Sequence, residues 1–303
     1  MKVYFKQNFW SKVEDGIPGI PKSLNWKFTY DNVEYFIPTV YYFSEGITID
    51  ILSFIDNEKF KMFYDKYAPI ESELNDEDIL FAEQERPIPE LPLGSIYINE
   101  QLVETSRCAS SYISFFRNDK KEKLSEIKEA YKISDEQSFY CTRVHAKYCT
   151  QREIDELKIV TNRTEELLKI RKHFTLNIVE AKNQNDIVFK HPLTNVEHHI
   201  YVNDIKLYDA RNDFPHHDHN APSNFAIIEY EIFPALSSDE RLIINEIEQE
   251  DIKGNYEKGK HGQKLEYTFT SKYWKRLKNI EFSITGIYKT KSMEKELIFN
   301  IIG

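Results

Sequence analysis

Glycine, cysteine and long apolar runs are scarce in this chain of 303 residues, and each scarcity excludes a class of protein. Nine glycines against 19 tyrosines and 20 phenylalanines disfavour a glycine-hinged nucleotide-binding fold and favour strands with a packed interior. Three cysteines, an odd number, do not make a disulfide framework and are typical of a reducing compartment. No uncharged apolar stretch reaches the roughly 18 to 20 residues that cross a bilayer, and residues 1–22 lack a signal peptide's apolar core. We therefore expect a soluble, cytoplasmic protein with no membrane partner.

The net charge and the absence of common catalytic motifs disfavour two further classes of function. The formal net charge of −10 disfavours sequence-independent binding to nucleic acid, because that affinity comes largely from Lys and Arg at phosphates. The chain contains no GxGxxG, GxxxxGK[ST], HExxH or GxSxG motif. These absences favour a binding protein over an enzyme.

The length predicts two domains, because 303 residues exceed the usual size of a single core. We expect a mainly β or α+β protein. Residues 1–160 are predicted to form an α+β domain, an antiparallel sheet with two helices, and residues 161–303 an antiparallel β-sandwich. The boundary falls within residues 150–171, where the pattern suits a helix and a strand about equally well.

The N-terminal half shows an antiparallel meander followed by a helix. Asp31-Asn32 and Asn99-Glu100 suit two-residue hairpin turns between alternating strands. Asp56 suits the N-cap of a helix that ends near Pro69, and residues 119–131 carry the pattern of a second helix. Residues 71–90 contain eight carboxylates and are predicted to form a solvated loop or a frayed helix.

The C-terminal half shows period-two apolar patterning, which marks strands with one buried face. The predicted strands are 174–178, 187–189, 196–202, 226–232, 242–247, 265–269, 280–284 and 297–301. Short strands with few helices are typical of a sandwich.

One predicted hairpin also carries a family resemblance. Residues 186–204 read as a strand, a turn at Pro192 to Asn195, and a second strand in which His198 shares the buried face. His191-Pro192-Leu193-Thr194 followed by His198 resembles an element of an uncharacterised, β-rich family of bacterial proteins in which a His-Pro-Leu/Val-Thr turn precedes a strand with a second histidine. Later strands are similar in order and character over about the C-terminal half. The resemblance implies a β-rich fold and no assigned activity.

The densest group of metal-ligating residue types follows this hairpin. His216, His217 and His219 surround Asp218, and imidazole and carboxylate ligands suit zinc or another divalent ion. One peptide segment usually supplies only two ligands, so His198, His199 and Asp209 are conceivable partners if the hairpin folds nearby. The other interpretation is an exposed polar loop in which no cofactor is required.

The cysteines offer a second constellation. Cys141, His145 and Cys149 are spaced by four, which on a strand spreads them over about 26 Å at ~3.3 Å per residue, too far for one ion. We predict half-buried cysteines that behave as small apolar residues. Cys108 has no base that the sequence can pair with it.

Aromatic residues are candidates for a ligand-binding face as well as for the core. The candidates are Trp10, Trp26, Trp274, Tyr41 and Tyr42. Tyr41 and Tyr42 must point to opposite faces if they lie on one strand. A protein or carbohydrate ligand would suit such a face, and exposed sheet edges suggest a homodimer formed by strand addition.

The sequence thus predicts a non-catalytic binding or interaction protein built on β-sandwich-like domains. The alternative is a metal-dependent hydrolase in which His216 to His219 hold the ion that activates water.

Overall fold

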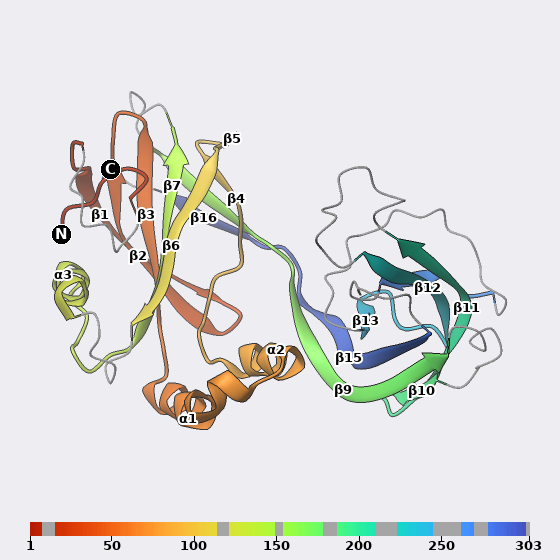
Figure 1. Cartoon of the computed structure of the whole chain (residues 1–303). Helices are drawn as coiled ribbons and strands as arrows, with labels where there is room; N and C mark the ends of the chain where they lie inside the picture. The colour runs from red at the N-terminus through yellow and green to blue at the C-terminus, as the bar shows by residue number, and fades with distance from the viewer. Residues whose placement is uncertain are drawn as a thin grey trace. The chain divides into compact units, whose positions relative to one another are not determined.

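The computed structural model describes residues 1–7, 16–113, 121–148, 154–177, 187–209, 223–244, 262–269 and 278–300. Antiparallel strands dominate this part of the chain, so the predicted mainly β fold is confirmed (Figure 1). The chain divides into two compact units. Unit 1 comprises Met1–Glu73, Glu85–Thr164 and Ser292–Gly303, and unit 2 comprises Leu74–Gln84 and Glu165–Lys291.

Unit 1 contains two sheets around one core. The five-stranded sheet has the order β1-β2-β3-β7-β6, and the four-stranded sheet the order β16-β8-β4-β5. The strands are β1 (Ile20–Tyr30), β2 (Val33–Tyr42), β3 (Gly46–Phe54), β4 (Leu93–Ile98), β5 (Gln101–Leu102), β6 (Thr105–Ile113), β7 (Phe139–Lys147), β8 (Glu156–Thr161) and β16 (Glu296–Asn300). Apolar side chains from the facing sides of both sheets, such as Ile49, Val144, Ile98 and Ile159, form one buried cluster. The N-terminal sheet that the sequence predicts is therefore one half of a sandwich.

The hairpin turns of unit 1 follow from residue types that tolerate positive φ. Asp31 and Asn32 have φ of 49° and 62°, and Asn99 and Glu100 have φ of 48° and 65°. These are the angles of the turn that matches the twist of paired strands. Gly46 serves a different purpose, because a Cβ there would lie 2.1 Å from the carbonyl oxygen of Ala146 on β7.

The described part of unit 1 also contains two helices, and each packs against the five-stranded sheet through its own small apolar cluster. Helix α1 (Asn57–Tyr67) begins after Asp56, whose side chain accepts hydrogen bonds from the amides of Glu58 and Lys59, and the turn η1 (Ala68–Glu73) follows it. Helix α3 (Lys121–Tyr131) packs Ile127 and Tyr131 on the side of the sheet that faces away from the sandwich core. Both helices occur where the sequence predicts them.

Unit 2 is a second antiparallel sandwich. One sheet has the order β10-β11-β12-β14 and the other β13-β15-β9. The strands are β9 (Thr164–Asn177), β10 (Ile187–Lys190), β11 (Glu197–Asp209), β12 (Asn224–Phe233), β13 (Glu240–Ile244), β14 (Glu266–Phe269) and β15 (Asn279–Ser292). Side chains from both sheets, including Leu176, Ile200, Ile228 and Ile284, share one buried cluster. A gap in this core, beside Tyr230 and Thr268, holds only about 10 Å³, room for roughly one water molecule.

Two segments differ from their sequence expectation. The acidic stretch, predicted as a solvated loop or a frayed helix, contains helix α2 (Asp76–Glu85), which begins after the cap residue Asn75 and differs from a solvated segment in burying Phe81 and Ala82. The last described strand, β16, pairs with β8 in unit 1, although the pattern alone grouped it with the C-terminal sandwich. Pairings between residues so far apart in the chain leave no local signal.

Candidate functional site

Of the predicted metal ligands, the structure describes only those on the hairpin, His198 among them. His216, His217 and His219 lie outside the described residues, so the zinc site that they suggest stays a prediction. His198 is described, and it lies on β11 with its side chain buried. Within the described ranges, no group of three or more His, Cys, Asp or Glu side chains is placed to hold a metal ion.

The turn between β10 and β11 is organised by His191. Its Nδ1 atom accepts hydrogen bonds from the backbone amides of Leu193 and Thr194, at 3.2 and 3.3 Å. Asn195 closes the turn with φ of 57°, in the left-handed region that asparagine tolerates. Because Nδ1 accepts two hydrogen bonds, the ring proton lies on Nε2.

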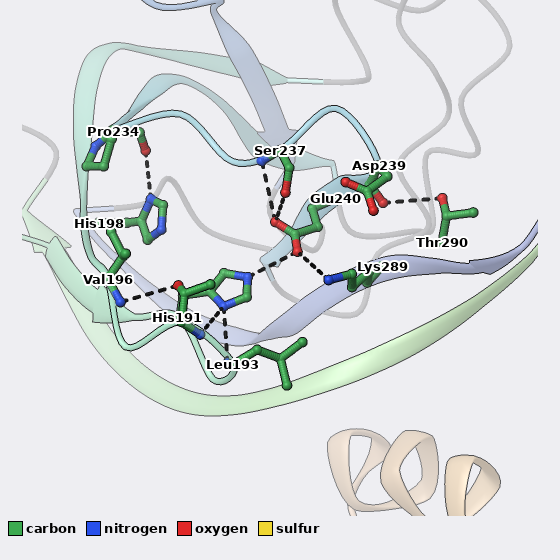
Figure 2. Close-up of polar contacts among 11 residues, drawn as sticks. His191, Leu193, Val196, His198, Pro234, Ser237, Asp239, Glu240, Lys289 and Thr290 are labelled. Carbon is green, nitrogen blue, oxygen red and sulfur yellow. Dashed lines mark hydrogen bonds and ion pairs between the residues drawn. The ribbon is translucent and has the colours of Figure 1, made fainter.

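The Nε2 atom of His191 donates to Glu240, the first residue of β13 (Figure 2). The two atoms are 3.2 Å apart, and both side chains are at least 95% buried. The Glu240 carboxylate also accepts from the hydroxyl of Ser237 at 2.5 Å and lies 3.5 Å from the ammonium of Lys289 on β15. Burial acts to raise the pKa of Glu240, but the hydrogen bond from Ser237 and the neighbouring His191 outweigh it, and the pKa is lowered.

A second histidine fixes the adjacent loop. His198 donates from Nδ1 to the carbonyl oxygen of Pro234 at 2.7 Å, and its ring stacks on Phe189 at 5.2 Å. The loop that begins at Pro234 leads to Ser237 and Glu240, so both histidines hold the same connection between β12 and β13. We name His191, His198, Ser237, Glu240 and Lys289 the unit 2 clasp.

The contacts of the clasp are those of a structural support. Both ring nitrogens of His191 are committed, and the lowered pKa of Glu240 makes it a weak base with its oxygens already occupied. The clasp links β10 and β11 in one sheet to β13 and β15 in the other. Its physical effect is to fasten the two sheets of unit 2 at one end.

Unit 1 has its own buried charged cluster, on the side of the five-stranded sheet beneath α3. Asp50 on β3 and Arg143 on β7 are cross-strand neighbours, and the guanidinium donates two hydrogen bonds of 2.7 Å to the carboxylate. The Tyr131 hydroxyl of α3 donates to Asp50 at 2.5 Å and lies 3.2 Å from the Tyr41 hydroxyl. Asp50 is fully buried and Arg143 nearly so. This ion pair anchors the helix on the sheet.

His145 and Cys141 lie on the same side of β7 as Arg143. Burial and, next, the charge of Arg143 lower the pKa of His145 to about 4, and its Nδ1 is 2.6 Å from the Thr48 hydroxyl. Burial raises the pKa of the Cys141 thiol, which makes it a poor nucleophile. Cys141 therefore behaves as a small apolar residue, as predicted, and Cys149 lies outside the described residues.

The outer face of the four-stranded sheet of unit 1 is different, because it exposes apolar side chains. Ile298 pairs with Lys158, Lys158 with Tyr97, and Tyr97 with Leu102, so one cross-strand row spans β16, β8, β4 and β5. Their strand neighbours Phe299, Leu157, Ile96 and Val103 point into the core. Ile298 and Leu102 are 53% and 58% exposed. We name Ile298, Lys158, Tyr97 and Leu102 the open row.

Charge on the open row is balanced. The ammonium of Lys158 lies 4.4 Å from the centroid of the Tyr97 ring and 3.3 Å from a carboxylate oxygen of Glu296. The cation is therefore shared between an aromatic face and an acid on the same sheet. The row therefore exposes apolar surface at its two ends, with an aromatic ring between them.

Sequence reasoning named other aromatic residues and missed this row. Trp26 stacks on Phe299 in the core region, Tyr41 is buried against Val3 and Phe43, and Tyr42 packs against the sandwich core. Tyr41 and Tyr42 do point to opposite sides, as predicted. Trp10 and Trp274 lie outside the described residues. The missed signal is a run of three consecutive apolar residues, Leu297, Ile298 and Phe299. On a strand with only one buried face, such a run must place an apolar side chain on the solvent side as well.

Comparison with known proteins adds no relative, because no family model, curated protein or solved structure matches the chain. The family suggested by the His191 turn therefore stays a prediction. Among the described residues, no helix is both long enough and apolar enough to cross a membrane.

Proposed function

We propose that this chain is a non-catalytic interaction protein that binds a partner protein through the open row of unit 1. The observation that supports the proposal is the register itself. Four strands brought together from three distant parts of the chain place Ile298, Tyr97 and Leu102 in one line on the solvent side. The solvent face of an antiparallel sheet is ordinarily polar, and exposed apolar groups gathered on one face are typical of binding surfaces.

The chemistry of the row favours an apolar protein surface as the partner. Aliphatic side chains stand at both ends, whereas a carbohydrate platform needs polar groups around its aromatic ring to bind hydroxyls. The only cation of the row, Lys158, already has Glu296 and Tyr97 as partners. A partner that relied on opposite charge would have to displace Glu296.

The test is to place charge on the row and follow one defined partner. Leu102→Asp/Ile298→Asp should abolish capture of that partner while leaving the thermal midpoint close to that of the unaltered protein, because both side chains are more than half exposed. The partner is first identified by affinity capture from the source cells, and its binding to purified protein is then measured by calorimetry.

A matched control adds the same charge elsewhere on unit 1. Met62 and Met293 are 72% and 66% exposed, so Met62→Asp/Met293→Asp removes as much exposed apolar surface away from the row. This variant should bind like the unaltered protein. Equal loss of binding in both variants, or no loss in either, would contradict the proposed surface.

A further inference from the structure

Helix α2 packs on β9 of unit 2 through ion pairs and one buried aromatic side chain. The helix begins with Asp76, Glu77 and Asp78, and the facing side of β9 carries Lys169, Arg171 and His173. Arg171 forms an ion pair with Asp78, and His173 Nε2 lies 3.9 Å from Glu77, which also accepts a hydrogen bond from Ser283 at 3.0 Å. The acidic turn of the helix thus meets a basic strip on the strand.

One aromatic side chain anchors the helix. Phe81 is 3% exposed, and its ring centroid lies 4.9 Å from the Lys169 ammonium and 4.5 Å from the Arg171 guanidinium. One turn farther on, Gln84 accepts a hydrogen bond from the backbone amide of Leu167 at 3.3 Å. Since β9 is the last strand of its sheet among the described residues, α2 also covers part of a sheet edge, which is a common protection against strand addition.

The covalent path to α2 is unusual. The chain passes between the units at 73/74, 84/85, 164/165 and 291/292, so every residue between Gln84 and Glu165 belongs to unit 1. On the C-terminal side of α2, residues 86–92 contain Pro87, Pro89 and Pro92 and form neither helix nor strand. Proline fixes φ and favours an extended, semi-rigid spacer. The helix is therefore a short docked segment between two connections, and it is joined to its docking site only by a long detour.

We propose that the β9 strip is a docking site for the α2 helix of a second copy of this chain, so that two copies exchange helices reciprocally. The occupant is α2 because the spacing of its acids, Phe81 and Gln84 fits the strip. An exchanged helix makes the same contacts as the helix of its own chain, which is why segment exchange is a low-cost route to a dimer. Only Phe81 and Ala82 of α2 are buried, so little apolar surface is exposed during the exchange.

A charge-reversal experiment separates docking within a chain from docking between chains. One variant carries Glu77→Lys/Asp78→Lys and the other carries Arg171→Glu/His173→Glu, so each alone places like charges across its own contact. In a mixture, reciprocal exchange pairs Lys with Glu at one contact and the native residues at the other. All four substitutions in one chain provide the matched control, because they restore opposite charges within that chain.

The readouts are mass by light scattering and hydrogen exchange of the α2 amides. Each variant alone should have the mass of one chain, 36.1 kDa, with faster exchange in α2. The equimolar mixture should show twice that mass with α2 protection recovered, and the fourfold variant should recover protection as a single chain. A mixture that stays at single-chain mass while the fourfold variant is protected would overturn the exchange.

Two other outcomes would also overturn it. If neither reversal alone speeds exchange in α2, or if the fourfold variant stays unprotected, charge does not seat the helix. This inference goes beyond the proposed function, since it concerns a surface of unit 2, and its outcome leaves partner binding at the open row of unit 1 untouched.

Discussion

The two units bury charge in different ways. In unit 1, Asp50 and Arg143 form a bidentate ion pair between neighbouring strands of one sheet. In unit 2, Glu240 is held by Ser237, by His191 with its proton on Nε2, and by Lys289, which is about one third exposed, and the contacts run between two sheets. The two arrangements predict different losses of stability when one partner is removed. Removing one partner leaves an unpaired buried charge in unit 1 but only a weakened hydrogen-bond network in unit 2.

Breaking the ion pair of unit 1 should have the largest effect. Arg143→Met leaves the Asp50 carboxylate buried without its cation, and we expect a loss of about 3 to 5 kcal/mol in the free energy of unfolding of unit 1. Native-state hydrogen exchange of the β3 and β7 amides measures this loss for unit 1 alone.

Two controls sharpen this prediction. Asp50→Leu/Arg143→Met removes both charges and should recover part of the stability, because no unpaired charge is left. Lys147 lies on the same strand as Arg143, and Lys147→Met, which removes an exposed ion pair with Glu104, should cost less than about 1 kcal/mol. If Arg143→Met proves as mild as Lys147→Met, the ion pair does not anchor the unit.

The next effect is a pH dependence confined to unit 1. The pKa of His145 is about 4 in the folded protein, against an ordinary value of 6.5. Above pH 6.5 the ring is neutral in both states. As the pH falls from 6.5 toward 4, the unfolded chain takes up the proton first, and unit 1 should lose about 2 to 3 kcal/mol.

His145→Gln serves as the reference, because it cannot take up a proton in that pH range. The difference in unfolding free energy between the two proteins, measured by urea titration from pH 7 to pH 4, should shrink steadily as the pH falls. A constant difference across the range would show that His145 is protonated as readily in the folded state as in the unfolded one.

Much of the fold follows from local sequence. The alternation along 187–189 and 196–202 and the Asp31-Asn32 and Asn99-Glu100 turns predicted strands that the structure contains, because period-two burial and positive φ are properties of a few adjacent residues. The second sheet of unit 1 could not be predicted in this way. Its strands come from 93–102, 156–161 and 296–300, and only the packed structure brings them together.

The smallest effect is expected at the unit 2 clasp. Glu240→Gln keeps the shape of the side chain and removes its charge, and we expect a loss of about 1 to 2 kcal/mol in unit 2 at pH 7. Because the pKa of Glu240 is lowered from 4.5, its contribution is present above that pH and is lost as the pH falls through the folded pKa. Amide exchange of residues 191–196 measures the change.

Glu197→Gln is the matched control on the same hairpin. Its carboxylate is about half exposed and lies 3.7 Å from His199, so the substitution should change stability by less than about 0.5 kcal/mol. Equal effects of the two substitutions would mean that the clasp does not fasten the sheets.

The candidate sites, like the fold, could be predicted only where the signal lies in adjacent residues. The sequence drew attention to His191 and His198 through their turn, and Asn195 takes the positive φ that the turn needs. Their partners, Glu240 and Pro234, lie 49 and 36 residues away, which no local pattern reveals. The open row could not be found either, since an exposed Ile298 acquires meaning only once Lys158, Tyr97 and Leu102 lie beside it.

The most direct test of the whole account is a hydrogen-exchange footprint of the complex with the captured partner. If the buried clusters are structural and the open row is the binding surface, the amides that gain protection should lie in β4, β5, β8 and β16. Protection gained instead around His191 and Glu240, or around Asp50 and Arg143, with the four-stranded sheet of unit 1 unchanged, would contradict it.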